Sequence, residues 1–373
     1  MAGSKFGEIF QITTWGESHG KALGVVIDGC PAELSLCEDD IQKYLNRRRP
    51  GTSQFATKRT ESDSVQILSG VFEGKTTGCP ISLIVFNEDQ RSADYSEIAQ
   101  TYRPGHADFC YDAKYGVRDY RGGGRSSARE TLARVAAGTV ALKILEELGV
   151  SVAAYTKAIG DVCIDDSKIS LSERFNNPLC MPNAEAATRA EALLNRVMAE
   201  GDSVGGVVEC VLEGTPKGIG EPVFNKLDAA LASAIMSVNA VKGIEFGSGF
   251  KSAALLGSQN NDHMRYDEHL TLQKPTNHAG GIYGGIADGS PIVFRAAIKP
   301  TPSISRPQNT VNATGENVEI STKGRHDPVI APRAVVVIEA MAALVLVDYI
   351  FMGMTSKMDG IKRFFEGERQ AAL

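Results

Sequence analysis

The segment from Ala334 to Met354 constrains the fold more than any other part of the chain, because it is apolar on nearly every side. The stretch AVVVIEAMAALVLV leaves no polar face for water, so a helix with this sequence must be covered all round. A membrane span would also be apolar, but Glu339 and Asp348 interrupt the run. We therefore predict a buried core helix, and Pro332 suits its first turn.

The chain is long enough for a large core around such a helix, and its composition is that of a soluble globular protein. It has 373 residues, of which 43% are hydrophobic and 23% are charged. The formal net charge of −6 argues against a general nucleic-acid or membrane-surface binder. The seven cysteines include no CxxC pair, so we expect reduced thiols rather than disulfides or a zinc site. With no signal-peptide pattern at its N-terminus, the protein is expected to be cytoplasmic.

Hydrophobic periodicity predicts three further helices and a set of strands. Ser127 and Glu130 have capping-box spacing at the start of a helix that ends at Leu148. Other helices are expected from Asn183 to Glu200 and, with a weaker pattern, from Asn225 to Ser237. Strands are expected at Leu23 to Ile27, Val65 to Leu68, Ile81 to Phe86, Val204 to Leu212 and Ile292 to Ile298.

The order and patterning of these elements predict an α+β fold. Polar alternation and flanking glycines favour antiparallel strand pairs, and the order is not a regular alternation of strand and helix. No linker rich in proline and serine divides the chain, so we expect one domain over residues 1–373. Long polar loops are expected at 47–59, 91–125, 242–289 and 299–333, and loops of this length are usually functional.

The segment RGGGRSSARE, Arg121 to Glu130, has the features of an anion site. Its three glycines let a ligand approach the backbone, and a helix start presents unpaired N–H groups to an anion. Neither the G-K-[ST] motif nor the full G-x-G-x-x-G motif is present. A tight turn before a capped helix explains the segment equally well. The charge of the neighbouring residues is therefore needed to distinguish the two interpretations.

Arginines gather around this segment. From Arg103 to Arg134 there are seven basic and four acidic residues, a net charge of +3 in an acidic chain. A second basic stretch comprises Arg47 to Arg49 with Lys58 and Arg59. The guanidinium fork binds carboxylates and phosphates through two hydrogen bonds. A solvated charge run explains RRR by itself, but two basic segments flanked by glycine and proline favour a small polyanion.

Four of the six histidines lie in turns marked by glycine or proline: His19, His106, His278 and His326. Histidine transfers protons near neutral pH, and loops often carry catalytic groups. The spacing of the histidines does not match a metal site, so no metal is expected. Glu17-Ser18-His19 suggests a serine hydrolase, but adjacent serine and histidine cannot easily form a triad, and no G-x-S-x-G motif occurs.

Seven segments of the chain, several of them long and unusual, together resemble the chorismate synthase family. They run in the family's order over nearly the whole sequence. The segments are GESHG (Gly16–Gly20), RRRPG (Arg47–Gly51), RPGHAD (Arg103–Asp108), YRGGGRSSARET (Tyr120–Thr131), NAVKG (Asn239–Gly243), TNHAGG (Thr276–Gly281) and KGRHDP (Lys323–Pro328).

The resemblance implies a lyase that catalyses the last step of the shikimate pathway to aromatic amino acids. This enzyme converts 5-enolpyruvylshikimate 3-phosphate to chorismate and phosphate by a 1,4-anti elimination. The family requires reduced FMN although the reaction has no net redox change. The implied fold is a single-domain β-α-β sandwich, with helices between antiparallel sheets, and the implied assembly is a homotetramer.

The resemblance also assigns roles to residues of this chain. His19 would protonate the departing phosphate, His106 would protonate or hold the reduced flavin, and Asp327 would take part in proton removal near the flavin. The residues that match the family's substrate contacts are Arg48, Arg129 and Arg134. Those that match its flavin contacts are Arg125, Ser126, Ser127, Asn239, Ala240, Gly284, Lys299, Pro300, Thr301, Pro302, Ser303 and Arg325.

One departure from the family concerns pyridine nucleotides. Many bacterial members have an arginine where this chain has Gln54, a position linked in the family to NADP contact or to loop charge. Contact with NADPH is therefore an open question for this chain. No flavin-reductase segment or Rossmann fingerprint is visible, so an external partner is expected to reduce the flavin.

Two other classes of function remain as alternatives. A phosphotransferase or phosphatase acting on a sugar phosphate could use the glycine and arginine segment, but no Walker-type lysine or acidic metal cluster is evident. A non-catalytic RNA binder could use RRRPG. The acidic net charge and the aromatic content of only 7% count against it.

Overall fold

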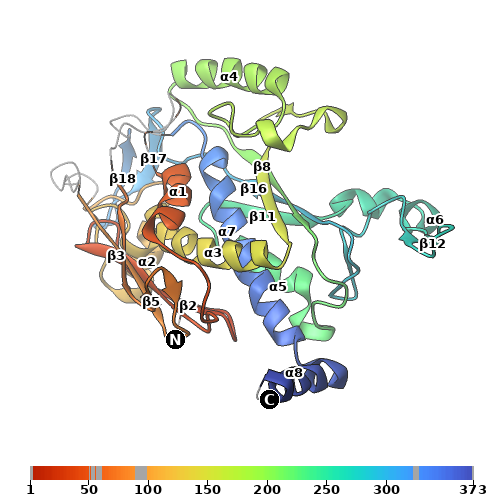
Figure 1. Cartoon of the computed structure of the whole chain (residues 1–373). Coiled ribbons are helices and arrows are strands. Elements are labelled where there is room, and N and C mark those ends of the chain that lie inside the picture. Colours follow the sequence, from red (N-terminus) through yellow and green to blue (C-terminus); the bar gives the residue numbers. More distant parts are fainter. Residues whose placement is uncertain are drawn as a thin grey trace.

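Two five-stranded sheets lie on either side of a group of helices (Figure 1). The computed structural model describes residues 3–49, 51, 55, 61–88, 99–321 and 327–371. The strand pairs of the two sheets are antiparallel, as the polar alternation of the strands predicted. The predicted α+β class, with mixed helices and antiparallel sheets, is therefore confirmed.

The first sheet is built from the N-terminal part of the chain, and the second from its middle and C-terminal parts. The first has the order β1 (Lys5–Phe6), β2 (Gln11–Gly16), β3 (Ala22–Asp28), β7 (Ile81–Phe86), β4 (Val65–Ser69). The second has the order β11 (Val241–Phe246), β16 (Ile292–Ile298), β10 (Gly206–Glu213), β8 (Ser151–Ile159), β9 (Val162–Cys163). Burial alternates along β7 and β16, because one face of each sheet packs on helices.

Four helices fill the space between the sheets. They are α1 (Glu38–Arg48), α3 (Thr131–Glu147), α5 (Leu227–Met236) and α7 (Ala331–Gly353). Helices α1 and α3 pack on the first sheet, α5 and α7 pack on the second, and both α1 and α3 also contact α7. The hydrophobic core therefore continues from one sheet through the helices to the other.

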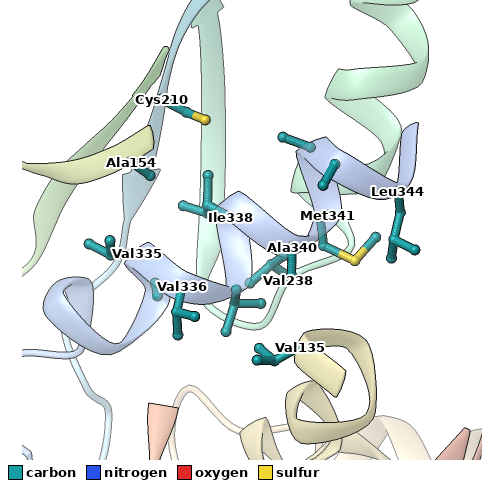
Figure 2. Close-up of a cluster of buried hydrophobic side chains, with 14 of the residues drawn as sticks. Val135, Ala154, Cys210, Val238, Val335, Val336, Ile338, Ala340, Met341 and Leu344 are labelled. Carbon is teal, nitrogen blue, oxygen red and sulfur yellow. The ribbon is translucent and has the colours of Figure 1, made fainter. Parts of the chain in front are cut away.

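Helix α7 lies at the centre of this arrangement and confirms the prediction of a core helix. Figure 2 shows Val135 of α3 facing Val336 on one side of α7, with Cys210 of β10 nearer Ile338 on another side. Among the described helices, α7 alone is long and apolar enough to cross a membrane, but 83% of its apolar window is buried inside the protein. Such burial is what an all-round apolar helix needs in a folded core.

The remaining elements surround this frame. The helices are α2 (Asp108–Tyr115), α4 (Ala184–Ala199), α6 (Gly257–Asn260) and α8 (Met358–Ala371). Two-stranded hairpins pair β5 (Val71–Phe72) with β6 (Lys75–Thr76), β12 (Arg265–Tyr266) with β13 (Leu272–Gln273), β14 (Ile282–Tyr283) with β15 (Ile286–Ala287), and β17 (Gln308–Val311) with β18 (Asn317–Ile320). Short 3-10 helices are η2 (Gly124–Ser126), η3 (Ala128–Glu130), η4 (Asp166–Lys168), η5 (Leu171–Glu173), η6 (Val223–Asn225) and η7 (Gly249–Ala254).

All four predicted helices and all five predicted strands form, but periodicity missed several elements. The missed strand β8 has the sequence SVAAYTKAI, whose small side chains give little hydrophobic signal. Helix α1 has only Ile41 and Leu45 as buried apolar residues. The long loops were predicted too loosely as well, because α2 and the β17–β18 hairpin form within two of them.

The predicted capping box at the start of α3 is wrong. The Ser127 hydroxyl accepts a hydrogen bond from the backbone N–H of Arg129 at 3.3 Å and caps η3, and α3 itself begins only at Thr131. The Glu130 carboxylate instead accepts hydrogen bonds from Thr14 Oγ1 at 3.0 Å and from Arg134 Nε at 2.8 Å. The Glu130 carboxylate pairs with Arg134, one turn along the helix, and so does not make the hydrogen bond of a capping box.

Candidate active site

The glycine run before α3 lies directly against His19. Gly122, Gly123 and Gly124 all have positive φ, at +116°, +88° and +51°, so the backbone turns tightly before η2 and η3. A Cβ added to Gly122 would lie 2.2 Å from His19 Cε1. Glycine is therefore required at position 122 so that the loop can lie against the imidazole. The lack of a side chain also leaves the loop backbone open to a ligand.

His19 lies in the turn between β2 and β3 and is 7% exposed. Its Nδ1 lies 3.0 Å from Ser18 Oγ, which also lies 3.3 Å from the carbonyl oxygen of Gly122. A carbonyl oxygen only accepts, so both contacts are satisfied when Ser18 donates to Gly122 and accepts from His19 Nδ1–H. The Ser18 N–H also donates to the Gly124 carbonyl at 3.4 Å, which ties the turn to the glycine loop.

His106 lies in the turn that leads into α2 and is held at both ring nitrogens. Its Nδ1 is 3.1 Å from the Pro104 carbonyl oxygen, and its Nε2 is 3.1 Å from Ser303 Oγ. Burial, followed by the charge of Arg103, lowers the pKa of His106 to about 4. His106 is therefore neutral at pH 7.

The segment from Lys299 to Ser303 follows strand β16 and packs against the His106 turn. Lys299 Nζ donates to the Gly105 carbonyl at 2.7 Å, and Pro302 is so close that a Cβ on Gly105 would lie 2.7 Å from it. The Thr301 hydroxyl is buried and has no hydrogen-bond partner among the described residues. A buried polar atom in this state is suited to a ligand that supplies the missing partner.

Asn239 and Ala240 connect this segment with the glycine loop. Asn239 Nδ2 donates to the Ser126 carbonyl at 2.9 Å, and Lys299 N donates to the Ala240 carbonyl at 2.9 Å. Ala240 has a φ of +70°, which is unusual for a residue with a side chain. Three segments far apart in the sequence thus meet, and each carries residues that the resemblance assigned to the flavin.

One of the described singled-out positions, Gly284, does not join this group. Gly284 lies in the β14–β15 turn beside Gly285, whose carbonyl accepts from Leu227 N at 3.0 Å at the start of α5. Asn239 follows the other end of α5, and a helix of this length spans about 15 Å. Gly284 therefore lies apart from the other predicted flavin residues of the chain. Arg325 and Gln54 lie outside the described residues.

Arg48 and Arg129 are buried, with exposures of 3% and 6%, and share an acidic partner. Asp63 lies 3.2 Å from Arg48 Nη1 and 2.9 Å from Arg129 Nη1. Arg129 also donates to Asn87 Oδ1 at 2.6 Å and lies 3.3 Å from Glu61. Burial, then the nearby Arg333, lowers the pKa of Arg48 to about 9. Both side chains are held in fixed positions before any ligand arrives.

Arg125 and Arg134 have different surroundings from each other. Arg125 donates to Thr14 Oγ1 at 2.8 Å and to the Gly16 carbonyl at 3.2 Å, so its guanidinium braces strand β2. Arg134 pairs with Glu130 at 2.8 Å and donates to Ser237 Oγ at 2.6 Å. The side chain of Arg134 therefore links α3 with the end of α5.

Arg333 is a site residue that sequence reasoning missed. With Arg48, Thr131 and Asn239 it lines a small cavity of about 60 Å³ between α3 and α7. Arg333 Nη1 lies 2.5 Å from Asp327 Oδ2. The Asp327 carboxylate is therefore paired with a side chain from the first turn of α7. In the sequence, Arg333 is the last residue of the predicted loop 299–333. Only the structure shows that Arg333 lies on α7 and faces Arg48.

These groups define a class of site: buried arginines and a bare glycine backbone suit a small polyanion, and His19 and His106 are side chains able to transfer protons. Among the described residues no group of three or more histidine, cysteine or acidic side chains is arranged to hold a metal ion.

Comparison with known proteins identifies the family. The model of the family described as "Chorismate synthase" matches residues 10–351. The chorismate synthase of Lachnoclostridium phytofermentans is 61% identical over 366 residues, 98% of this chain and 100% of the relative. That of Lachnospira eligens is 62% identical over 365 residues, again covering 98% and 100%. A crystal structure of chorismate synthase has a TM-score of 0.76 at 31% identity, covering 97% of this chain and 98% of that one.

The chain belongs to the chorismate synthase family. The prediction of an enzyme of this kind is thereby confirmed. The alternative of a phosphotransferase or phosphatase finds no support in these comparisons.

Proposed function

We propose that this chain converts 5-enolpyruvylshikimate 3-phosphate to chorismate and phosphate by a 1,4-anti elimination, the last step of the shikimate pathway. The observation that carries the proposal is the meeting of His19 with the glycine loop, beside the buried pair Arg48 and Arg129. The substrate has two carboxylates and a phosphate, and arginine forks suit such groups. His19 is a general acid placed to protonate the departing phosphate.

Reduced FMN fits the segments around His106. Lys299 supplies positive charge for a phosphate, and the buried Thr301 hydroxyl still has a hydrogen bond to make with a ligand. The remaining contacts would come from Ser126, Ser127, Asn239, Ala240, Pro300, Pro302 and Ser303, with Arg125 supporting the loop from behind. When bound, reduced FMN supplies electron density transiently, with no net redox change.

The arginines and Asp327 complete the assignment of roles. Arg48, Arg129 and Arg134 orient the substrate, because their guanidinium groups are already fixed by carboxylate and hydroxyl partners. Asp327 takes part in removing the ring proton, and Arg333 holds its carboxylate in place at 2.5 Å. Gly284 and Arg325 remain proposed flavin contacts by resemblance alone.

The wider setting of the enzyme is also proposed from the family. Residues 1–373 form a single catalytic domain with the β-α-β sandwich of the family, and four copies assemble into a cytoplasmic homotetramer. An external partner reduces the flavin.

An anaerobic assay tests this function. The purified protein is mixed with 5-enolpyruvylshikimate 3-phosphate and photoreduced FMN, and chorismate and phosphate are measured together. Equal amounts of both products are expected, and none when the flavin is left oxidised. If folded protein makes no product with reduced FMN, the proposed function is wrong.

A further inference from the structure

We infer that Asp108 is a positioning residue that holds His106 in one tautomer, with the proton on Nδ1 and with Nε2 turned toward Ser303 as a hydrogen-bond acceptor. The effect on turnover rests on the proposed function, whereas the tautomer itself does not. The inference depends on three sets of contacts around the turn from Arg103 to Asp108.

The first set closes the turn that contains His106. The carboxylate of Asp108 accepts three hydrogen bonds from Arg103, at 3.0 Å from N, 2.8 Å from Nε and 2.7 Å from Nη2. Within the turn, His106 N donates to the Arg103 carbonyl at 3.2 Å. A guanidinium fork on a carboxylate has a fixed geometry. The backbone on both sides of His106 is therefore held by one side chain.

The second set secures Asp108 from its other side. Arg118 Nη1 lies 3.6 Å from Asp108 Oδ2, and Arg118 also donates to the Ala99 carbonyl at 3.0 Å. Asp108 is 5% exposed. Burial raises the pKa of Asp108, but the hydrogen bonds and charge of Arg103 outweigh it and hold the pKa below its ordinary value. Asp108 is thus an ionised carboxylate enclosed by two guanidinium groups.

The third set determines where the proton of His106 lies. The Pro104 carbonyl oxygen is 3.1 Å from Nδ1, and because a carbonyl only accepts, Nδ1 must carry a proton. The charged groups that face the ring are Arg103, Asp108 and Lys299, two cations and one anion. Burial of the ring and the two cations lower the pKa of His106 and outweigh the Pro104 carbonyl and Asp108, which raise it, so the ring is neutral and Nε2 is unprotonated. Nε2 then accepts a hydrogen bond from the Ser303 hydroxyl at 3.1 Å.

The consequence is a specific chemical role for His106. In this tautomer the single lone pair of Nε2 accepts from Ser303, and Nε2 gives no proton in its resting state. A hydrogen-bond donor of a bound ligand can use Nε2 only by replacing the Ser303 hydroxyl, and any acid role would need a proton delivered to Nε2 first. Asp108 acts on this tautomer through the turn that it closes, because its hydrogen bonds go to Arg103 and not to the ring.

Nitrogen NMR on protein labelled with ¹⁵N at histidine tests the inference without substrate or flavin. The chain has six histidines, so the His106 signals are assigned by their loss in His106→Gln. We expect one protonated Nδ1 and one unprotonated Nε2 throughout pH 6 to 8. A ring protonated on Nε2, or on both nitrogens, in this range overturns the inference.

Variants of Asp108 then test its part. In Asp108→Asn we expect a mixture of tautomers and a kcat lower by about 10-fold with KM little changed. Asp108→Glu keeps the carboxylate and should keep the single tautomer. Asp112→Asn is the matched control, because Asp112 lies on the same helix and pairs with Arg118 at 3.1 Å, whereas the fork of Arg103 is taken by Asp108.

The outcomes separate this inference from the proposed function. An Asp108→Asn spectrum identical to that of the unmodified protein overturns the role of Asp108. If that variant does not fold, as judged by circular dichroism, the spectra of the unmodified protein and of Ser303→Ala still decide the tautomer. Failure of the assay with 5-enolpyruvylshikimate 3-phosphate, with the expected NMR spectrum, would reject the function alone.

Discussion

His19 is buried and His106 is partly buried, and each has a serine partner, yet their charged surroundings differ. His106 lies between Arg103 and Lys299, and burial with the first of these cations lowers its pKa to about 4. His19 lies near Asp119, whose pKa is lowered mainly by a hydrogen bond from Arg121 and also by His19. A nearby carboxylate favours a charged imidazole, and nearby cations oppose one. The two imidazoles therefore differ in the charged groups that surround them.

The largest effect is expected for His19→Ala. Loss of a general acid should lower kcat by about 100- to 1,000-fold in the chorismate assay. His278→Ala is the matched control, because His278 Nδ1 is also paired with a serine, Ser248 Oγ at 2.9 Å, but outside the site. An unchanged rate for His19→Ala would remove His19 from the mechanism.

A smaller loss is expected for His106→Ala, about 10- to 100-fold in kcat, since the neutral ring orients a ligand and does not transfer its own proton. The pH dependence sharpens the comparison. With a pKa of about 4, His106 should contribute no change in kcat between pH 6 and 8. A pH profile of His106→Gln that differs in shape from that of the unmodified protein in this range would contradict the contrast between the two histidines.

Gly122→Ala should disturb His19 and leave His106 in place. The new Cβ would lie 2.2 Å from His19 Cε1, so either the ring or the loop must move, and we expect kcat to fall by about 10-fold. Gly74→Ala is the control for backbone strain, because Gly74 has a φ of +76° but a Cβ added there would meet nothing within 4 Å. Equal rates for Gly122→Ala and Gly74→Ala would show that the contact with His19 has no importance.

Two substitutions near the start of α3 test whether flavin binding and substrate binding depend on separate residues, as the contrast between the two histidines suggests. Ser127→Ala should weaken flavin binding by a few-fold, about the loss of one hydrogen bond, and change the KM for substrate less. Arg134→Ala should do the reverse, because its guanidinium group is assigned to the substrate. Fluorescence titration measures flavin affinity, and steady-state kinetics measure the KM for substrate. Equal changes of both quantities in each variant would show that the two residues do not distinguish flavin from substrate.

The smallest effect concerns stability. A histidine whose pKa is about 4 in the folded protein and about 6.5 when unfolded binds more protons in the unfolded state between these values. His106 therefore contributes stability above pH 6.5 that is lost as the pH falls toward 4. Urea unfolding at a series of pH values should show a shallower loss for His106→Gln, and His19→Gln supplies the comparison. Identical pH slopes for His106→Gln and the unmodified protein would argue that His106 is not held neutral.

Prediction from the sequence succeeded where a residue's role depends on its near neighbours. The core position of α7 follows from an all-round apolar run, and the antiparallel strands follow from their alternation. The glycine run and the His19 turn, which the sequence singled out separately, lie against each other in the structure. Prediction failed for β8, whose small side chains carry little pattern, and for the capping box, where Glu130 has stronger partners in Thr14 and Arg134.

The sequence by itself determined the family and the class of fold, and it supplied the candidate residues for the site. Only the tertiary structure decided what each charged residue does. Arg48 and Arg129 share Asp63, Arg125 braces β2, and Arg333 joins the site beside Asp327. The reason is that hydrophobic patterns repeat over a few residues, whereas these ion pairs join segments brought together only by packing. A motif shows which side chains are available, and the fold selects the partners that set their charge and direction.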